Sequence, residues 1–84
     1  MTIEHEAGLH ARPATLFVKT ASEYDADIRA SYEGRSVNAK SSLQVLTLGA
    51  EQGAEITVRA EGEDAEEALD ALTRLVESNF ETEE

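Results

Sequence analysis

One histidine in this chain lies in a setting that suits chemistry at its ring. Residues 8–14 read Gly-Leu-His-Ala-Arg-Pro-Ala, so His10 follows a glycine closely and Arg12 stands two positions further on. Pro13 is typical of the first turn of a helix, because its missing N–H costs nothing there. The spacing therefore predicts His10 at a helix N-terminus, where free N–H groups and the positive end of the helix dipole attract an anion.

A phosphoryl group on an imidazole nitrogen is the chemistry that this setting favours. A histidine must be neutral to attack phosphorus, and both the helix N-terminus and the guanidinium of Arg12 disfavour the protonated ring. The same groups stabilise the phosphoryl oxygens during transfer, which depends mostly on positioning and charge stabilisation. The simpler alternatives are a cap or partly buried polar side chain for His10 and a solvated side chain for Arg12.

Hydrophobic periodicity predicts the elements that must hold these residues. The expected elements are strands at about residues 2–7, 26–32, 37–39 and 56–60, and helices at about residues 11–22, 41–48 and 64–80. Ser41 caps the short second helix, and Asp64 with Glu67 has the spacing of a capping box. This β-α-β-β-α-β-α order predicts an α+β fold, an antiparallel sheet with helices on one side. We expect a single domain over residues 1–84 with a frayed tail at residues 82–84.

Composition excludes several classes of function. Eighteen acidic and 7 basic residues give a formal net charge of −11, which excludes sequence-blind binding of nucleic acid. No apolar stretch approaches the roughly 20 residues of a membrane helix, and residues 1–6 do not resemble a signal peptide. There is no cysteine, and His5 is expected to be structural and not a metal partner of His10. We expect a soluble cytoplasmic protein without metal or cofactor.

The charge is distributed unevenly along the chain. Ten acidic residues and one basic residue lie in residues 61–84, whereas residues 7–22 and 34–50 contain no acidic residue. The two acid-free segments either reflect helix and strand cores together with chance, or they line one face that accepts an anion. The acid excess itself resembles that of proteins adapted to high salt, where carboxylates keep the surface hydrated.

The chain resembles the HPr family, the histidine-containing phosphocarriers of the phosphoenolpyruvate:sugar phosphotransferase system. Residues 8–14 resemble the active-site signature, residues 37–49 the second signature around a regulatory-serine helix, and residues 60–68 a further family segment. The resemblance covers essentially the whole chain. It implies an open-faced sandwich, with a four-stranded antiparallel sheet of order 1-4-2-3 and three helices on one face.

The resemblance also implies roles for individual residues. His10 would accept a phosphoryl group on Nδ1 from phosphorylated enzyme I, charged by phosphoenolpyruvate, and pass it to an enzyme IIA domain of a fructose or other sugar system. Arg12 would assist as a cation, and Ser41 matches a serine that a dedicated kinase phosphorylates in some members. Docking of partners is implied for Ala11, Thr15, Leu43 and Leu46. Such a protein is a phosphoryl carrier and not an enzyme, and we expect a monomer.

The family geometry would bring the two acid-free segments together as one docking surface. The sequence departs from the family at Ala7, where a small hydrogen-bonding side chain is frequent, and at Gln44, where a lysine can stand. Two alternatives remain open. One is a member of the same family that serves a regulatory or dihydroxyacetone-kinase phosphorelay, and the other is a small α/β ligand-binding domain that never carries phosphate.

Overall fold

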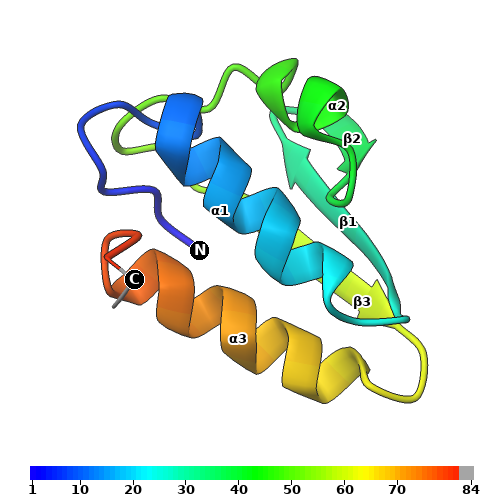
Figure 1. Ribbon diagram of the computed structural model, residues 1–84. Coiled ribbons are helices and arrows are strands. Elements are labelled where there is room, and N and C mark those ends of the chain that lie inside the picture. The colour runs from blue at the N-terminus through cyan, green and yellow to red at the C-terminus, as the bar shows by residue number, and fades with distance from the viewer. Residues whose placement is uncertain (82–84) are drawn as a thin grey trace.

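The computed structural model describes residues 1–81 as one layer of strands and one of helices (Figure 1). The elements, in chain order, are α1 (Ala11–Ser22), β1 (Asp27–Tyr32), β2 (Arg35–Asn38), α2 (Ser42–Leu46), β3 (Thr57–Glu61) and α3 (Ala65–Glu77). The predicted helices, the hairpin and the last strand are therefore confirmed, with shifts of a few residues at their ends. The predicted frayed tail at residues 82–84 lies outside the described residues.

The sheet is antiparallel, with the strand order β2-β1-β3. Along β1 the side chains alternate, so that Ile28 and Ala30 are buried while Asp27 and Arg29 are exposed. Helices α1 and α3 run side by side over one face of this sheet, and α2 packs against α1 and β2 at the end of the layer (Figure 1). The other face of the sheet carries no helix among the described residues, as predicted for an open-faced arrangement.

The prediction of a fourth strand at residues 2–7 is wrong. The main chain of Met1 exchanges two hydrogen bonds of 2.8 Å with that of Ile56, and the main chain of Ile3 is hydrogen-bonded to residues 53 and 54. These contacts amount to an isolated bridge between Thr2 and Glu55 and not to a strand. Beyond Ile3 the chain turns, because the N–H of Gly8 donates to the carbonyl of His5 at 2.9 Å. The sheet thus has three strands, which keep the relative order expected for them in the 1-4-2-3 arrangement.

The capping box predicted at the start of α3 is also wrong. Asp64 is the N-cap residue, but its side chain caps nothing in its own helix. Its carboxylate instead accepts from the N–H groups of Asp25 at 2.9 Å and Ala26 at 2.8 Å, at the entrance to β1. The side chain therefore stabilises a long-range tie between two segments, a role that the local spacing could not indicate.

The hydrophobic core lies between the sheet and the helices. Phe17 from α1, Ile28 from β1 and Leu72 from α3 are fully buried in it. On α3 the apolar side chains of Ala68, Leu72, Leu75 and Val76 are buried, and so is Phe80 just beyond the helix. No helix within residues 1–81 is long and apolar enough to cross a membrane.

Candidate functional site

The loop that leads to His10 is held against residues 50–51. The N–H of Leu9 donates to the carbonyl of Ala50 at 2.8 Å, and the side chain of Leu9 is fully buried. Gly8 has φ +68°, and a Cβ atom there would lie 2.5 Å from the carbonyl oxygen of Ala50 and 2.7 Å from the Cα of Glu51. Only glycine allows both this backbone conformation and this close approach, so Gly8 fixes where the loop lies.

His10 itself is the N-cap residue of α1, with extended backbone angles of φ −132° and ψ 165°. The ring is half-buried. It makes no capping hydrogen bond, and no hydrogen bond joins it to any other residue in the range 1–81. Both ring nitrogens are therefore uncommitted beside the first turn of the helix, where the leading N–H groups have no acceptor within the helix.

The next residue has an unfavourable backbone conformation. Ala11 has φ +52°, in the left-handed region that residues with a Cβ rarely adopt. The hydroxyl of Thr15 donates to the carbonyl of Ala11 at 3.1 Å and so supports this first turn. A conformation of this kind costs of order 1–2 kcal/mol and is concentrated at functional sites in proteins. Because Ala11 directly follows His10, its backbone conformation supports a functional site at this turn.

The first turn of α1 contains no acidic side chain to compete with an anion. Arg12 and Thr15 are both exposed there, and Pro13 is buried in the same turn. The structure thus brings the predicted acceptor and the predicted assisting cation to the start of one helix.

The short helix α2, which packs against α1, presents an exposed apolar surface. Leu43 is 75% exposed and Leu46 is 41% exposed, whereas Val45 is buried and anchors the helix. The hydroxyl of Ser41 accepts from the N–H of Gln44 at 3.3 Å, which confirms the predicted cap. The helix ends at Leu46 and not before Gly49 as predicted.

Two contacts that hold α2 in place were missed by the sequence reasoning. The side-chain carbonyl of Gln44 accepts from the N–H of Asn38 at 3.0 Å, and Arg35 donates to the carbonyl of Thr47 at 2.9 Å. Both join α2 to the end and beginning of β2. Neither has a local sequence signal, because each depends on how the hairpin folds back against the helix.

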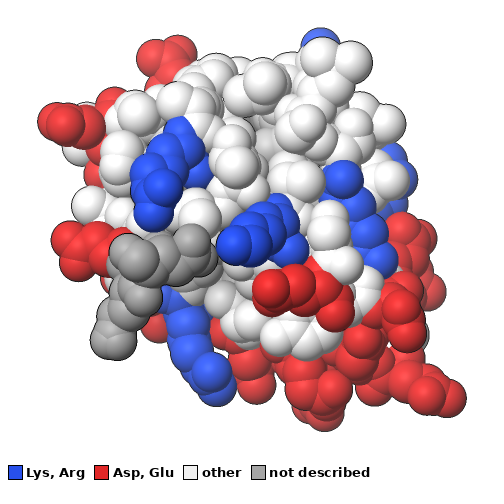
Figure 2. All heavy atoms as spheres, viewed as in Figure 1, with Lys and Arg blue, Asp and Glu red and all other residues white. Residues whose placement is uncertain are grey.

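The two acid-free segments do lie together in the fold, since α1 packs against α2. Figure 2 shows the upper middle and upper right of this face without acidic side chains and some red side chains at its left edge, whereas red side chains gather most densely at the lower right, where Figure 1 places the beginning of α3. Chance exclusion from helix and strand cores does not require such clustering. The arrangement supports the interpretation that these segments form one surface suited to an anionic group.

His5 is placed as predicted, in a structural role. Its ring meets that of Phe80 edge-to-face, with 6.1 Å between the centroids, and its Nδ1 accepts from the N–H of Ala7 at 3.1 Å. Within residues 1–81 no group of three or more histidine, cysteine or acidic side chains could hold a metal ion.

Comparison with known proteins agrees with this architecture. A family model described as the phosphotransferase-system HPr component phosphorylation site matches residues 1–78. The crystal structure of HPr-C-His from Thermoanaerobacter tengcongensis is similar at 45% identity and a TM-score of 0.95, and covers 100% of this chain and 94% of that chain.

Two further solved structures give the same result. The phosphocarrier protein HPr from Bacillus anthracis has 45% identity and a TM-score of 0.87, over 90% of each chain. An HPr dimer from Thermoanaerobacter tengcongensis has 45% identity and a TM-score of 0.83, over 98% of this chain and 94% of that one. With nearly its whole length matched and a histidine at the start of α1, this chain belongs to the HPr family of phosphocarriers of the phosphotransferase system.

Proposed function

We propose that this protein accepts a phosphoryl group on His10 from phosphorylated enzyme I and passes it to an enzyme IIA domain for sugar uptake. The observation that carries the proposal is the ring of His10, half-buried at the start of α1 and without a hydrogen bond to any other described residue. A structural histidine would use its nitrogens, as His5 does. The protein acts as a carrier that is phosphorylated transiently, and not as an enzyme.

The transfer is a displacement at phosphorus between two imidazoles. The lone pair of Nδ1 of His10 attacks the phosphorus of the donor phosphohistidine, an N–P bond forms, and the donor N–P bond breaks. The donor imidazole leaves with that electron pair. The guanidinium of Arg12 and the first N–H groups of α1 stabilise the charge on the phosphoryl oxygens. Transfer to enzyme IIA follows the same steps, with His10 as the leaving group.

Partner docking is proposed for the surface formed by α1 and α2. The exposed side chains of Leu43 and Leu46 offer apolar area on the helix that packs against α1, and Ala11 and Thr15 are exposed on α1 itself. Desolvated apolar anchors contribute most of the binding energy of protein interfaces. The lack of acidic residues in this surface also lowers repulsion toward a phosphorylated, negatively charged partner site.

Phosphorylation of Ser41 by a protein kinase is proposed as a second, regulatory event. A phosphate there remains at a helix N-terminus, where negative charge is tolerated, but it places that charge in the acid-free surface. Ser41→Asp should weaken binding to enzyme I in a calorimetric titration. Ser22→Asp, at the far end of α1, is the matched control, and equal affinities of the two variants would contradict a regulatory role.

Phosphate passage through the complete chain of partners tests the function. Labelled phosphoenolpyruvate, enzyme I and an enzyme IIA domain should yield labelled enzyme IIA only when this protein is added. Labelling of enzyme IIA that does not depend on this protein, or no labelling at all, would contradict the proposal. Light scattering during the same preparation tests the monomer that we expect, since one of the similar HPr structures is a dimer.

A further inference from the structure

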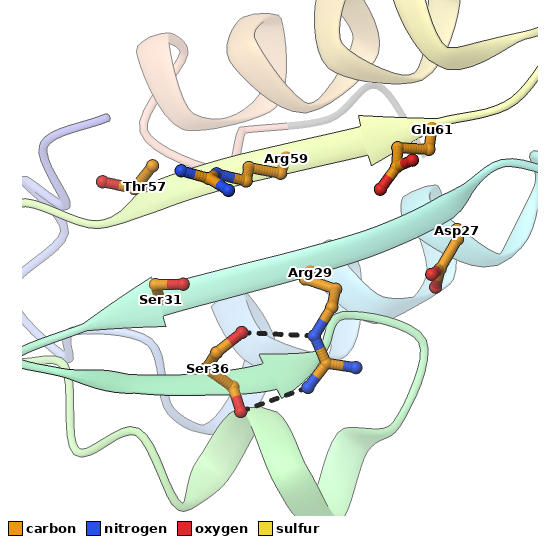
Figure 3. Close-up of a pocket in the computed structure, with 7 residues that line it drawn as sticks. All are labelled: Asp27, Arg29, Ser31, Ser36, Thr57, Arg59 and Glu61. Atoms are coloured by element: carbon orange, nitrogen blue, oxygen red, sulfur yellow. Dashed lines mark hydrogen bonds between the residues drawn. The ribbon is translucent and has the colours of Figure 1, made fainter.

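The open face of the sheet carries a patterned set of polar side chains that phosphate transfer at His10 does not use. A depression of about 460 Å³ lies there, lined only by residues of β1, β2 and β3 (Figure 3). The strand register arranges the lining in rows across the sheet. Ser31 is opposite Ser36 on one side and opposite Thr57 on the other, which makes a row of three hydroxyl groups.

The neighbouring row brings two like charges together. Arg29 and Arg59 are direct cross-strand partners. Directly opposite like charges destabilise a sheet, so an arginine pair in a chain of net charge −11 needs an explanation. The next row holds Asp27 opposite Glu61, but no ion pair joins either carboxylate to an arginine within the described part of the chain. The two positive charges are therefore not neutralised by direct ion pairs, although the same depression also holds the two carboxylates.

The two arginines are held differently. The guanidinium of Arg29 donates from Nε to the hydroxyl of Ser36 and from Nη2 to its carbonyl, both at 3.2 Å. Arg59 has no hydrogen bond or ion pair with any residue in the range 1–81. Figure 3 shows its guanidinium extending along β3 toward Thr57 and away from Glu61, while Arg29 turns toward Ser36.

Uncommitted donors therefore meet at the hydroxyl end of the depression. The hydroxyl groups of Ser31 and Thr57, like Arg59, have no hydrogen-bond partner among the described residues. Ser36 accepts from Arg29 and so keeps its own hydroxyl hydrogen for donation. The acidic row lies on the other side of the arginine row, two residues or about 7 Å beyond it along the strands, and so four residues from the hydroxyl row. The hydroxyl side of the arginine row thus offers hydrogen-bond donors and positive charge on the side away from the two carboxylates, which matches the oxygens of a compact dianion.

We propose that this face of the sheet binds a small dianionic oxyanion of the phosphate-monoester type between Arg29, Arg59 and the row of hydroxyl groups. The site is separate from the His10 turn, because the helices cover the opposite face of the sheet (Figure 1). Arg59 is the ligand whose loss tests the site most cleanly, since its side chain supports no other contact in the described chain.

The test is an NMR titration of the labelled protein with inorganic phosphate and, separately, methyl phosphate, with chloride at matched ionic strength as the reference. Saturable shifts should appear at Ser31, Thr57 and the Arg59 Nε–H. Arg59→Gln should weaken binding there by about fivefold, as expected for one exposed charge-assisted contact. The matched control is Arg74→Gln on α3, which removes the same charge from an exposed position and should leave binding unchanged.

Each outcome decides the proposal. Saturation by both ligands supports a phosphate-monoester site, and saturation by inorganic phosphate alone limits it to the free ion. Shifts that rise linearly, or equal binding in the two arginine variants, would show an adventitious ion only and overturn the proposal. Shifts at His10 and Arg12 report the proposed carrier site separately, and phosphorylation of His10 should be unaffected in Arg59→Gln.

Discussion

The reactivity proposed for His10 depends on what its side chain does not do. The residue caps α1 through its backbone, while its ring makes no hydrogen bond to another described residue. The sequence indicated this position correctly, because glycine before and proline after a histidine favour a loop that enters a helix. It could not indicate the positive φ of Ala11, since nothing in the alanine side chain favours that conformation. Surrounding packing must impose it.

Arg12→Ala should slow phosphoryl transfer to His10 by about tenfold to a hundredfold, the usual range for loss of one group that stabilises charge in a transition state. His10 should still become phosphorylated at long times, because the attacking nitrogen is unchanged. Rapid-quench kinetics with phosphorylated enzyme I measures the rate. Arg74→Ala, which removes an equal charge from α3, is the control, and equal rates for the two variants would remove Arg12 from the site.

The His10 loop is positioned as an element by a segment about 40 residues away. Gly8 and Leu9 lie against residues 50–51, and the turn that replaces the predicted strand is closed by main-chain bonding between His5 and Gly8. Alternation along residues 2–7 favoured a strand, but the tertiary contacts of residues 1–3 end before the pattern does. Such contacts have no local signal, which is why the sheet was predicted with four strands.

Gly8→Ala should therefore be far more destabilising than Gly49→Ala. The two glycines have nearly equal φ values, +68° and +67°, but a Cβ atom meets nothing within 4 Å at Gly49. Urea unfolding should show a loss of about 1 kcal/mol for Gly49→Ala from backbone strain alone, and of about 3 kcal/mol for Gly8→Ala. Equal losses would mean that the loop does not depend on its close approach to residues 50–51.

Asp64 connects α3 to the entrance of β1 and makes that connection sensitive to pH. The N–H of Asp25 contributes most, and with that of Ala26 it holds the pKa of Asp64 below its ordinary value of 3.8, against the opposing effect of burial. A carboxyl with a lower pKa in the folded state contributes stability above about pH 4 and loses it as the pH falls through the folded pKa.

The free energy of unfolding, measured from pH 7 down through the pKa of Asp64, should show the contribution of this carboxylate directly. Asp64→Asn should be less stable than the unmodified protein at pH 7 and should lose less stability on acidification. Glu63→Gln removes a neighbouring exposed charge that has no partner among the described residues, and its pH profile should follow the unmodified protein. Parallel profiles for Asp64→Asn and Glu63→Gln would contradict the role of these two hydrogen bonds.

The register of the sheet shows a further limit of sequence reasoning at this scale. Arg29 and Arg59 each occupy an exposed position in a correctly predicted strand, and their alternation was visible. That they are direct partners follows only from the pairing of β1 with β3. A shift of β3 by one residue against β1 would have placed Arg59 on the opposite face from Arg29, so the proposed site on the open face could not be foreseen.

The whole molecule separates its charges. Acidic residues are dense on α3, while α1 and α2 have none in their first turns. The sequence contains two acid-free segments, and the structure shows that the helices within them pack together. A net charge of −11 on 84 residues disfavours the compact state through self-repulsion unless salt screens it.

Stability should therefore rise with salt. The midpoint of thermal unfolding should increase by about 5 °C or more between about 0.1 M and about 2 M KCl. A variant with Glu66→Gln, Glu67→Gln and Asp70→Asn, all exposed on α3, should show a smaller increase because fewer like charges need screening. Equal midpoints at low and high salt would contradict adaptation of this surface to salt.

The stoichiometry of acid-labile phosphate on the protein tests the central claim most directly. After incubation with phosphoenolpyruvate and enzyme I, intact-mass measurement should show one phosphoryl group on the unmodified protein and on His5→Ala. It should show none on His10→Ala, whose circular dichroism should remain that of the folded protein. A phosphoryl group that persists in a folded His10→Ala variant, or its absence from the unmodified protein, would contradict the assignment of His10 as the acceptor.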